Sequence, residues 1–232
     1  MKHITIIKIL TLCGMALSTS CAIYHPQLGD IPLIREKGDT RIDLGISLTP
    51  PVVRTSVSYG LTESIAVQVA GNFMGEPVSD NRYYVQGATG LYKHLQNGNV
   101  MELYGGFGYG YGFSDYGFNA RSLSGNYQAY FTQFNYGVIR GKNKNTELAF
   151  GLKMGYLHTN VTKDKDRSDG VNYDRRNENG VFLEPTTLLR TGGEKLKFQI
   201  GLGGCWEFKI NRTERFSRAW PFNLGLGINY RL

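Results

Sequence analysis

Large apolar residues occupy every second position over long stretches of this chain, and the last eleven residues show the pattern most clearly. Between Phe222 and Leu232, side chains such as Leu224 and Ile228 alternate with glycine, asparagine and arginine. A strict period of two predicts a β-strand with one apolar face. Ten segments of this kind lie between turn-like residues: Thr40–Leu48, Val52–Leu61, Ser64–Phe73, Arg82–Lys93, Val100–Phe113, Tyr127–Arg140, Thr146–Val161, Val181–Thr191, Leu196–Phe208 and Pro221–Leu232.

The lengths and connections of these segments predict a barrel that crosses a membrane. Nine to eleven tilted residues cross a hydrocarbon core, whereas strands of soluble domains average five or six. Short connections alternate with longer polar ones, as expected when one end faces the periplasm and the other the exterior. The longer links are Met74–Asn81, Ser114–Asn126, Thr162–Gly180 and Lys209–Trp220. We therefore expect an all-β chain that forms a transmembrane antiparallel up-and-down β-barrel of about ten strands (about 8–12); a soluble lipocalin-like barrel is the alternative.

The same alternation assigns side chains to the two faces of the wall. Glu184, Arg190, Lys153 and Glu207 fall on the face opposite the large apolar residues, so we predict that they point into the lumen. Buried charges must be paired. We therefore expect salt bridges among these four residues and a plugged or narrow lumen, because open aqueous channels are typical of sixteen or more strands.

The start of the chain predicts an export signal. Lys2 and Lys8 accompany an apolar run over Ile9–Leu17, which Ser18–Cys21 follows. A charged start, a short apolar run and small residues before a cut site are typical of signal peptides. Small residues directly before a cysteine resemble the lipobox of bacterial lipoproteins, which implies cleavage before Cys21 and its acylation, although Ser18 stands where a lipobox usually has leucine. An ordinary signal peptide with an unmodified Cys21 is the alternative.

Three regions follow from these patterns: a lipoprotein signal peptide over residues 1–20, a lipidated N-terminal tether over 21–39, and an outer-membrane β-barrel over 40–232. The tether contains Pro26 and Pro32 and shows no clean alternation. Of the three cysteines, Cys13 leaves with the signal and Cys21 carries the lipid, so Cys205 is the one free thiol and no disulfide framework is expected.

Candidate chemistry is sparse in this sequence. His158 lies near a predicted outer strand end, and Asp164 or Asp166 follows in the next link. A rim enzyme acting on lipid or peptide would need these groups to converge. No Gly-x-Ser-x-Gly or His-Glu-x-x-His motif occurs. The run Asp164–Gly170 has Arg175 at the position where a calcium loop needs glutamate. We expect no catalytic residues, no metal and no cofactor other than the covalent lipid at Cys21.

The link from Lys209 to Trp220 is a candidate surface-binding loop. It carries Arg212, Arg215 and Arg218 at a spacing near three, within a chain of net charge +7. Basic residues beside aromatics at a membrane surface suit contact with lipopolysaccharide phosphates or with an acidic partner; an ordinary solvated loop is the alternative. Nucleic acid is not an expected partner of an exported protein, despite a sequence pI near 9.2.

Several short stretches, taken together, resemble a family of lipid-anchored outer-membrane barrels found in Bacteroidota. They are Cys21-Ala-Ile-Tyr-His-Pro26, Ile31-Pro-Leu-Ile-Arg-Glu-Lys-Gly38, Tyr104-Gly-Gly-Phe-Gly-Tyr-Gly110, Phe182-Leu-Glu-Pro185 and the closing strand. The resemblance implies an integral barrel with an N-terminal lipid anchor in the outer membrane of a Gram-negative bacterium, and it implies no activity. The chain ends in Leu232, whereas barrels recognised by the assembly machinery commonly end in phenylalanine.

The expected function is therefore that of a non-enzymatic barrel lipoprotein. We predict a structural or accessory component of an outer-membrane protein complex, in contact with outer-membrane lipid. The alternatives are a narrow pore or transporter for small solutes and the rim enzyme named above.

Overall fold

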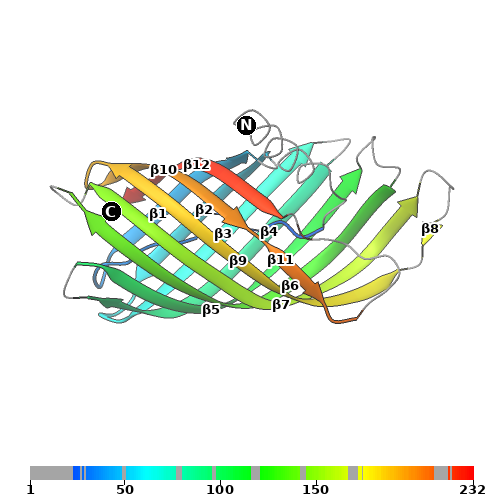
Figure 1. The fold of residues 1–232 in the computed structure, drawn as a ribbon, viewed down its shortest axis with the longest axis horizontal. Helices are drawn as coiled ribbons and strands as arrows, with labels where there is room; N and C mark the ends of the chain where they lie inside the picture. Colours follow the sequence, from blue (N-terminus) through cyan, green and yellow to red (C-terminus); the bar gives the residue numbers. More distant parts are fainter. Residues whose placement is uncertain are drawn as a thin grey trace, which may run out of the picture.

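The described residues form one antiparallel sheet that closes into a barrel (Figure 1). The structure is a computed structural model and describes residues 23–26, 28, 30–48, 51–76, 80–95, 98–115, 121–141, 145–166, 172–173, 175–211, 219 and 221–232. Within these residues, no helix is long and apolar enough to cross a membrane. The strands are β1 (Thr40–Leu48), β2 (Pro51–Gly60), β3 (Ile65–Glu76), β4 (Asp80–His94), β5 (Val100–Asp115), β6 (Arg121–Arg140), β7 (Thr146–Asp166), β8 (Asn172–Tyr173), β9 (Arg176–Gly192), β10 (Leu196–Gly204), β11 (Trp206–Lys209) and β12 (Phe222–Arg231).

Ten strand positions make up the ring, which confirms the predicted up-and-down barrel. Each of these positions pairs with its two neighbours in the ring, and β12 returns to β1, so that Arg41 lies opposite Arg231 and Ser47 opposite Gly225. β10 and β11 share one position, since both pair with β9. They are separated at Cys205, whose N–H donates to the carbonyl of Pro221 at 3.0 Å. The short β8 pairs only with the end of β7 among the described strands.

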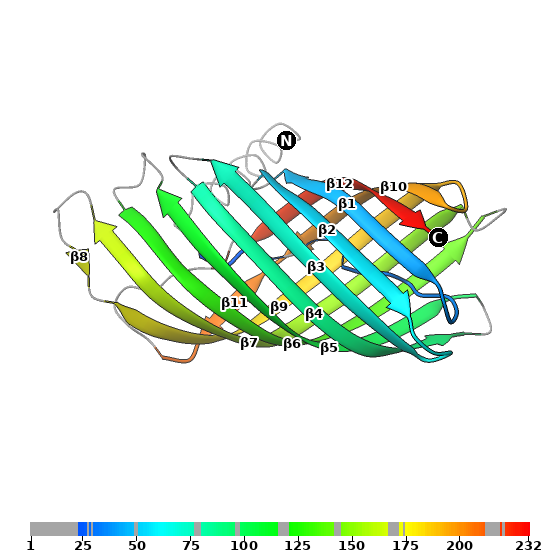
Figure 2. The same cartoon turned by 180° about the vertical axis from the view of Figure 1, so that it is seen from behind.

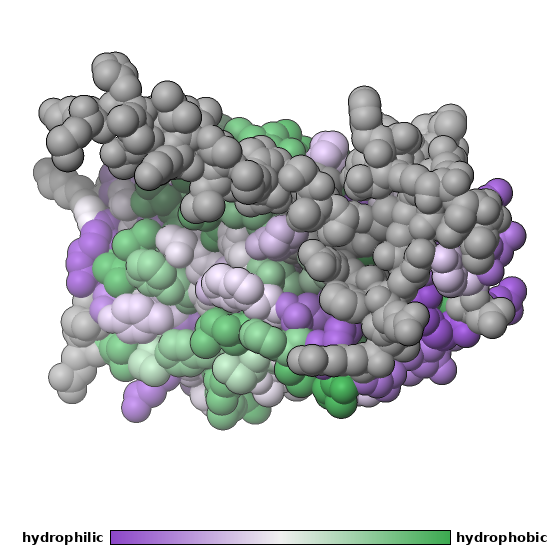
Figure 3. Space-filling view, turned by 45° about the vertical axis from the view of Figure 1, so that its right-hand side comes forward, coloured by the Kyte–Doolittle hydropathy of each residue, from purple (hydrophilic) through white to green (hydrophobic). Residues whose placement is uncertain are grey.

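Side-chain burial alternates along the strands and places the apolar face outside. Glu102 and Tyr104 of β5 are buried inside the barrel, whereas Leu103 between them is 53% exposed. Large apolar side chains that are more than half exposed include Val69, Phe73, Leu91, Phe198, Phe208 and Ile210. Green apolar side chains cover much of the central wall in Figure 3. An apolar exterior around a polar interior is the arrangement of a membrane-spanning barrel, and a soluble barrel would have the reverse.

The two ends of the barrel differ. At the turn end, the strands are joined through residues 61–64, 95–99, 141–145 and 193–195. At the loop end, the connections are residues 49–50, 77–79, 116–120, 167–175 and 210–221. Strands β6 and β7 have 20 and 21 residues, more than the nine to eleven that cross a bilayer. β6 ends and β7 begins at the turn end, where Arg140 lies opposite Thr146. Their extra length therefore projects from the loop end (Figure 2).

This projection corrects the prediction that Ser114–Asn126 and Thr162–Gly180 are loops. Most of their described residues continue β5, β6, β7 and β9. Many of these residues are polar, which suggested loops. Cross-strand hydrogen bonds nevertheless satisfy their backbone groups, and inner-face side chains such as Ser122, Leu123 and Asp164 are buried. Hydrophobic alternation marks only the part of a strand that faces lipid.

The largest departure from the sequence analysis concerns the predicted tether. Its described residues from Ile23 to Arg35 are buried inside the ring of strands, where Figures 1 and 2 show a dark-blue coil, whereas Glu36–Gly38 are exposed at the turn end. Five of its aliphatic side chains are at most 1% exposed: Ile23, Leu28, Ile31, Leu33 and Ile34. We call the described residues of 23–39 the plug. It connects to β1, and it also supplies the apolar part of the core.

Candidate functional site: the plugged lumen

The plug runs through the lumen in one direction, from the loop end to the turn end. Ile23 contacts the wall at Gly112 and Gly125, which are paired close to the loop end. At the other end, Asp39 accepts a hydrogen bond of 2.7 Å from Nε of Arg231, beside the end of β12. Between these points the carbonyl of Pro26 accepts from Nδ2 of Asn223 at 2.9 Å. The described residues of the plug therefore contact the lumen wall from the loop end to the turn end.

Wall glycines make room for this segment. A Cβ atom added at Gly112 would overlap the backbone of Ile23, and one added at Gly137 would overlap the side chain of Leu33. Leu33 itself has a φ of 55°, a left-handed conformation that non-glycine residues rarely adopt. The next residue, Ile34, donates its N–H to Oε1 of Glu102 at 2.7 Å. Packing against Gly137 and this hydrogen bond together hold the backbone at Leu33 in its left-handed conformation.

An aromatic cluster surrounds the plug near the loop end. The ring of Tyr24 lies 5.2 Å from that of Tyr127, 5.4 Å from that of Phe182 and 6.3 Å from that of Tyr84. The contacts to the two tyrosines are edge-to-face, which is a favourable geometry for aromatic pairs. Cys205, the predicted free thiol, belongs to the same cluster and is 3% exposed. We call these five residues the Tyr24 cluster.

Tyr24→Ala is expected to destabilise the barrel by about 3–5 kcal/mol, the range for truncating a buried aromatic side chain to alanine. The free energy of unfolding in detergent, followed by heat-dependent mobility on gels, measures the effect. Tyr109→Ala is the matched control, since Tyr109 is 41% exposed on the outer face of β5. Equal losses in the two variants would mean that the plug contributes nothing specific to stability.

A polar cluster occupies the middle of the lumen and contains two of the predicted lumen charges. Nζ of Lys153 lies 3.9 Å from the carboxylate of Glu184, 4.0 Å from that of Asp30 and 3.0 Å from Oε1 of Gln86. Gln86 donates in turn to Asp30 at 2.8 Å, and Gln133 donates to the Asp30 carbonyl at 2.7 Å. We call these residues the Lys153 cluster. It joins a plug carboxylate to four different strands of the wall.

A second ionic cluster lies near the turn end, around Glu147 of β7. Its carboxylate is fully buried and meets four cations: Arg35 at 2.8 Å, Arg41 at 3.3 Å, Arg190 at 3.6 Å and Lys197 at 3.6 Å. We call these five residues the Glu147 cluster. Arg35 comes from the plug and the other three cations come from β1, β9 and β10. A single carboxylate thus joins the plug to three neighbouring parts of the wall.

Arg190 has a further partner, Asp43, whose carboxylate lies 3.2 Å from its guanidinium. The four predicted lumen charges are therefore all inside, but they pair differently from the prediction. Only Lys153 and Glu184 pair with each other, and Arg190 pairs with Asp43 and Glu147. Glu147 was not among the predicted lumen charges, and period-two parity gives a side chain's face but not its partners.

The fourth predicted lumen charge, Glu207, lies in an ionic network near the loop end. Lys209 pairs with Glu207 at 2.6 Å and with Glu178 at 3.0 Å. Arg176 pairs with Glu178 at 2.8 Å and with Asp164 at 2.6 Å. These pairs connect β11, β9 and β7 near the loop end.

Lys209 was predicted as part of the surface-binding loop, and the structure instead places it on β11. Its side chain is 8% exposed and engaged with two carboxylates, so it does not form a free basic surface. The remaining predicted loop residues, Arg212, Arg215, Arg218 and Trp220, lie outside the described residues. Contact with lipopolysaccharide stays a prediction for them.

His158 does not meet the acidic groups that a rim enzyme would need. It is half-buried on β7 between the buried Leu157 and Thr159, so it faces the outer side of the wall. Its Nδ1 lies 2.7 Å from Oδ1 of Asn179, whereas Asp164 is buried and paired with Arg176. The Asp166 side chain lies outside the described residues. Among the described residues, no group of three His, Cys, Asp or Glu side chains is placed to hold a metal ion.

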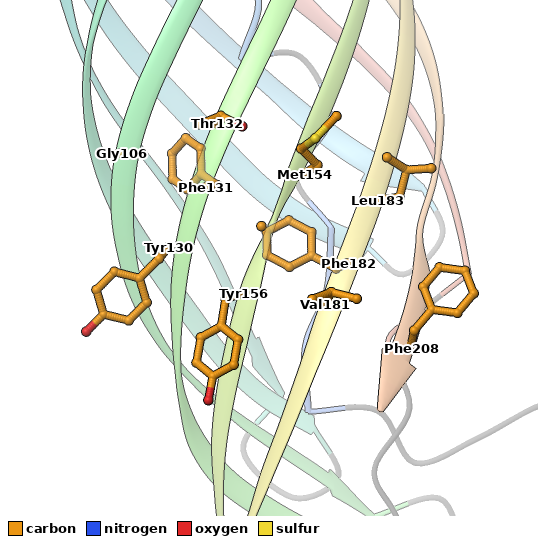
Figure 4. Close-up of a pocket in the computed structure, with 11 residues that line it drawn as sticks. Gly106, Tyr130, Phe131, Thr132, Met154, Tyr156, Val181, Phe182, Leu183 and Phe208 are labelled. Carbon is orange, nitrogen blue, oxygen red and sulfur yellow. The ribbon is translucent and has the colours of Figure 1, made fainter. Parts of the chain in front are cut away.

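Two small cavities lie between the plug and the wall. One of about 10 Å³ is bordered by Asp30, Lys153 and Glu184, and one of about 20 Å³ by His25 and Arg54. Each has room for about one water molecule. Larger hollows lie elsewhere on the described surface. A groove of about 720 Å³ on the outer wall is shown in Figure 4, where Tyr130, Tyr156 and Phe208 border it.

These features define a transmembrane β-barrel with a filled lumen. No protein-family model matches the sequence, and no curated protein matches it. Among solved structures, the chain is similar to the N-terminal β-barrel domain of OprF from Pseudomonas aeruginosa, with a TM-score of 0.39 and 10% identity over 85% of this chain and 100% of that domain. At this level of similarity, nothing about the function of that domain transfers to this chain.

Proposed function

We propose that this protein is a lipid-anchored outer-membrane barrel with a closed lumen, which acts as a non-enzymatic structural or accessory component of an outer-membrane assembly. The observation that carries the proposal is the plug. It fills the lumen from end to end and is held by three clusters of buried contacts. A barrel filled in this way offers other molecules its outer wall and its two ends.

The anchor is proposed from the start of the sequence. A short apolar run is followed by Ser18-Thr19-Ser20-Cys21, and Cys21 precedes Ile23, the first described residue of the plug, by two residues. An acylated Cys21 would add a second hold on the membrane to that of the barrel wall. The outer groove in Figure 4 is apolar and lies on the lipid-facing side, which suits contact with acyl chains or with an apolar surface of a partner barrel.

The absence of enzymatic activity is proposed from the placement of the candidate groups. His158 faces outward, and the buried acids near it are engaged with Arg176 and Lys209. General acid–base chemistry needs groups within hydrogen-bonding reach of the same substrate atom. These side chains point to opposite faces of the wall.

A pore is the second candidate function, and the plug itself favours it. The described residues of the plug form no strand, although the plug is continuous with β1. Its release would leave a lumen lined by charged residues such as Arg41, Glu147 and Arg190. Single-channel recording on the intact protein and on a variant without the plug separates the pore from the accessory role, and it requires no knowledge of a ligand.

Extraction of the protein from its own outer membrane in mild detergent, at natural expression level, tests the proposed role. We expect a discrete particle well above one 26.0 kDa chain plus its micelle, with companion proteins identified by mass spectrometry. The mass of the intact chain from the same particle is expected to show cleavage before Cys21 and added acyl groups. A lone monomer would contradict the accessory role, and an unmodified cysteine would contradict the anchor.

A further inference from the structure

The direction of the plug determines where the N-terminus leaves the barrel. Residues 36–39 lie at the turn end, since the Gly38 N–H donates to the Gly60 carbonyl at 2.8 Å and Arg231 pairs with Glu36 at 3.0 Å. Ile23 lies at the opposite end, against Gly112 and Gly125. The described part of the plug therefore begins at the loop end.

The level of Ile23 in the membrane follows from its wall contacts. Gly112 is twelve residues beyond Val100, the first residue of β5 at the turn end. At about 3.3 Å per residue and a tilt of about 45°, this separation is about 28 Å along the membrane normal. A hydrocarbon core is about 30 Å thick, so Ile23 lies at the level of the interface at the loop end.

Cys21 precedes Ile23 by two residues in the sequence. Two residues span at most about 7 Å, which is much less than the thickness of the hydrocarbon core. The return path through the lumen is filled by the plug, as the buried side chains of Leu28, Ile31 and Leu33 show. Acyl chains on Cys21 thus have only the lipid around the loop end within reach.

We propose that the N-terminus of the mature protein emerges at the cell surface and that the acyl chains of Cys21 enter the outer leaflet of the membrane. The part concerning acyl chains rests on the proposed lipid anchor, whereas the direction of threading does not. The orientation follows from the rule that barrels place short turns in the periplasm and long loops outside. The proposed partner of the acyl chains is therefore the outer-leaflet lipid next to the loop end.

Threading also constrains assembly. The plug leads directly into β1, and β1 closes the ring by pairing with β12 from Arg41 to Ser47. Since the finished lumen has no free path, the N-terminus must pass to the loop end before β1 and β12 pair. The lipid is then held on the outer side by the closed wall.

Thiol labelling of intact cells tests this proposal with the full-length chain. Ala22→Cys places a thiol beside the proposed anchor, and Cys205 gives no background because it is 3% exposed. Arg175→Cys marks the loop end and Glu63→Cys marks the turn end, both at exposed positions. With a membrane-impermeant maleimide, we expect A22C and R175C to be labelled in intact cells. E63C is expected to be labelled only after the outer membrane is permeabilised.

Each outcome decides one part of the proposal. An A22C variant that stays unlabelled in intact cells, while R175C is labelled, overturns the threading direction. Labelling of the unsubstituted protein at Cys21 would show a free thiol, which overturns the lipid anchor and leaves the direction standing. Heat-dependent gel mobility verifies that every variant folds. An epitope inserted between Ala22 and Ile23 and detected with antibody on intact cells repeats the test without a thiol.

Discussion

Glu147→Gln is expected to destabilise the barrel by about 3–5 kcal/mol, the cost of removing one partner from a buried ionic group. The reason is the number of cations that share this carboxylate. Arg35, Arg41, Arg190 and Lys197 all lie within 3.6 Å of it. Glutamine keeps the size of the side chain and removes the charge, so the loss measures electrostatics rather than packing.

Denaturant titration of the purified barrel, followed by tryptophan fluorescence, gives the free energy of unfolding. Trp206 on β11 is 55% exposed on the outer wall and reports on the transfer from lipid to water. Glu194→Gln in the exposed turn between β9 and β10 is the matched control, and there we expect no measurable change. An unchanged midpoint in Glu147→Gln would show that the Glu147 cluster is not a stabilising element.

A double-mutant cycle isolates the contact between plug and wall. Arg35→Gln removes the plug's cation, and its combination with Glu147→Gln is expected to cost less than the sum of the single losses. The coupling energy assigns part of the stability to the plug itself. Additive losses would mean that Arg35 and Glu147 do not interact in the folded barrel.

Deletion of residues 23–34 is expected to turn a non-conducting barrel into a conducting one. This deletion removes Leu28, Ile31 and Leu33, which fill the lumen, together with Asp30 of the Lys153 cluster. Single-channel recording in planar bilayers measures the effect. The intact protein is expected to give no steady current, and steady current through it would overturn the closed-lumen proposal in favour of the pore.

The buried thiol supplies an independent measurement on the same deletion variant. Cys205 packs in the Tyr24 cluster, so removal of Tyr24 with the plug is expected to open it to a small water-soluble thiol reagent. The intact protein is the control and is expected to react only when unfolded. A deleted barrel that folds, stays closed to ions and leaves Cys205 unreactive would show that the wall alone closes the lumen.

The barrel wall was predictable because its signal is local. Period-two alternation is imposed at each strand by the difference between lipid and lumen, so β1 and the other strands could be placed from residues such as Leu44 and Ile46 alone. The even number of strands and the alternating connections followed from the same pattern. Prediction failed at the projecting ends of β6 and β7. The outer face there carries polar residues such as Lys163 and Lys165, and the buried face carries Asp164 and Ser122, so no hydrophobic alternation marks the strand.

The candidate site was predictable only in part. Parity placed Lys153, Glu184, Arg190 and Glu207 in the lumen, but it gave neither Asp43 nor Glu147 as the partners of Arg190. Partners are set by register around the ring and by the shear of the sheet, which no single strand encodes. A high content of aliphatic residues in Ile23–Ile34 was a usable signal, since a solvated tether has no reason to carry them.

The sequence by itself thus determined a closed, membrane-spanning wall of about ten strands, because alternation repeats in every segment and needs no knowledge of the other segments. Only the tertiary structure decided what fills the wall. The plug has no period of its own, and its burial depends on a lumen that exists only after β12 has returned to β1. Its direction, from the loop end at Ile23 to the turn end at Asp39, is fixed by contacts with strands far away in the sequence.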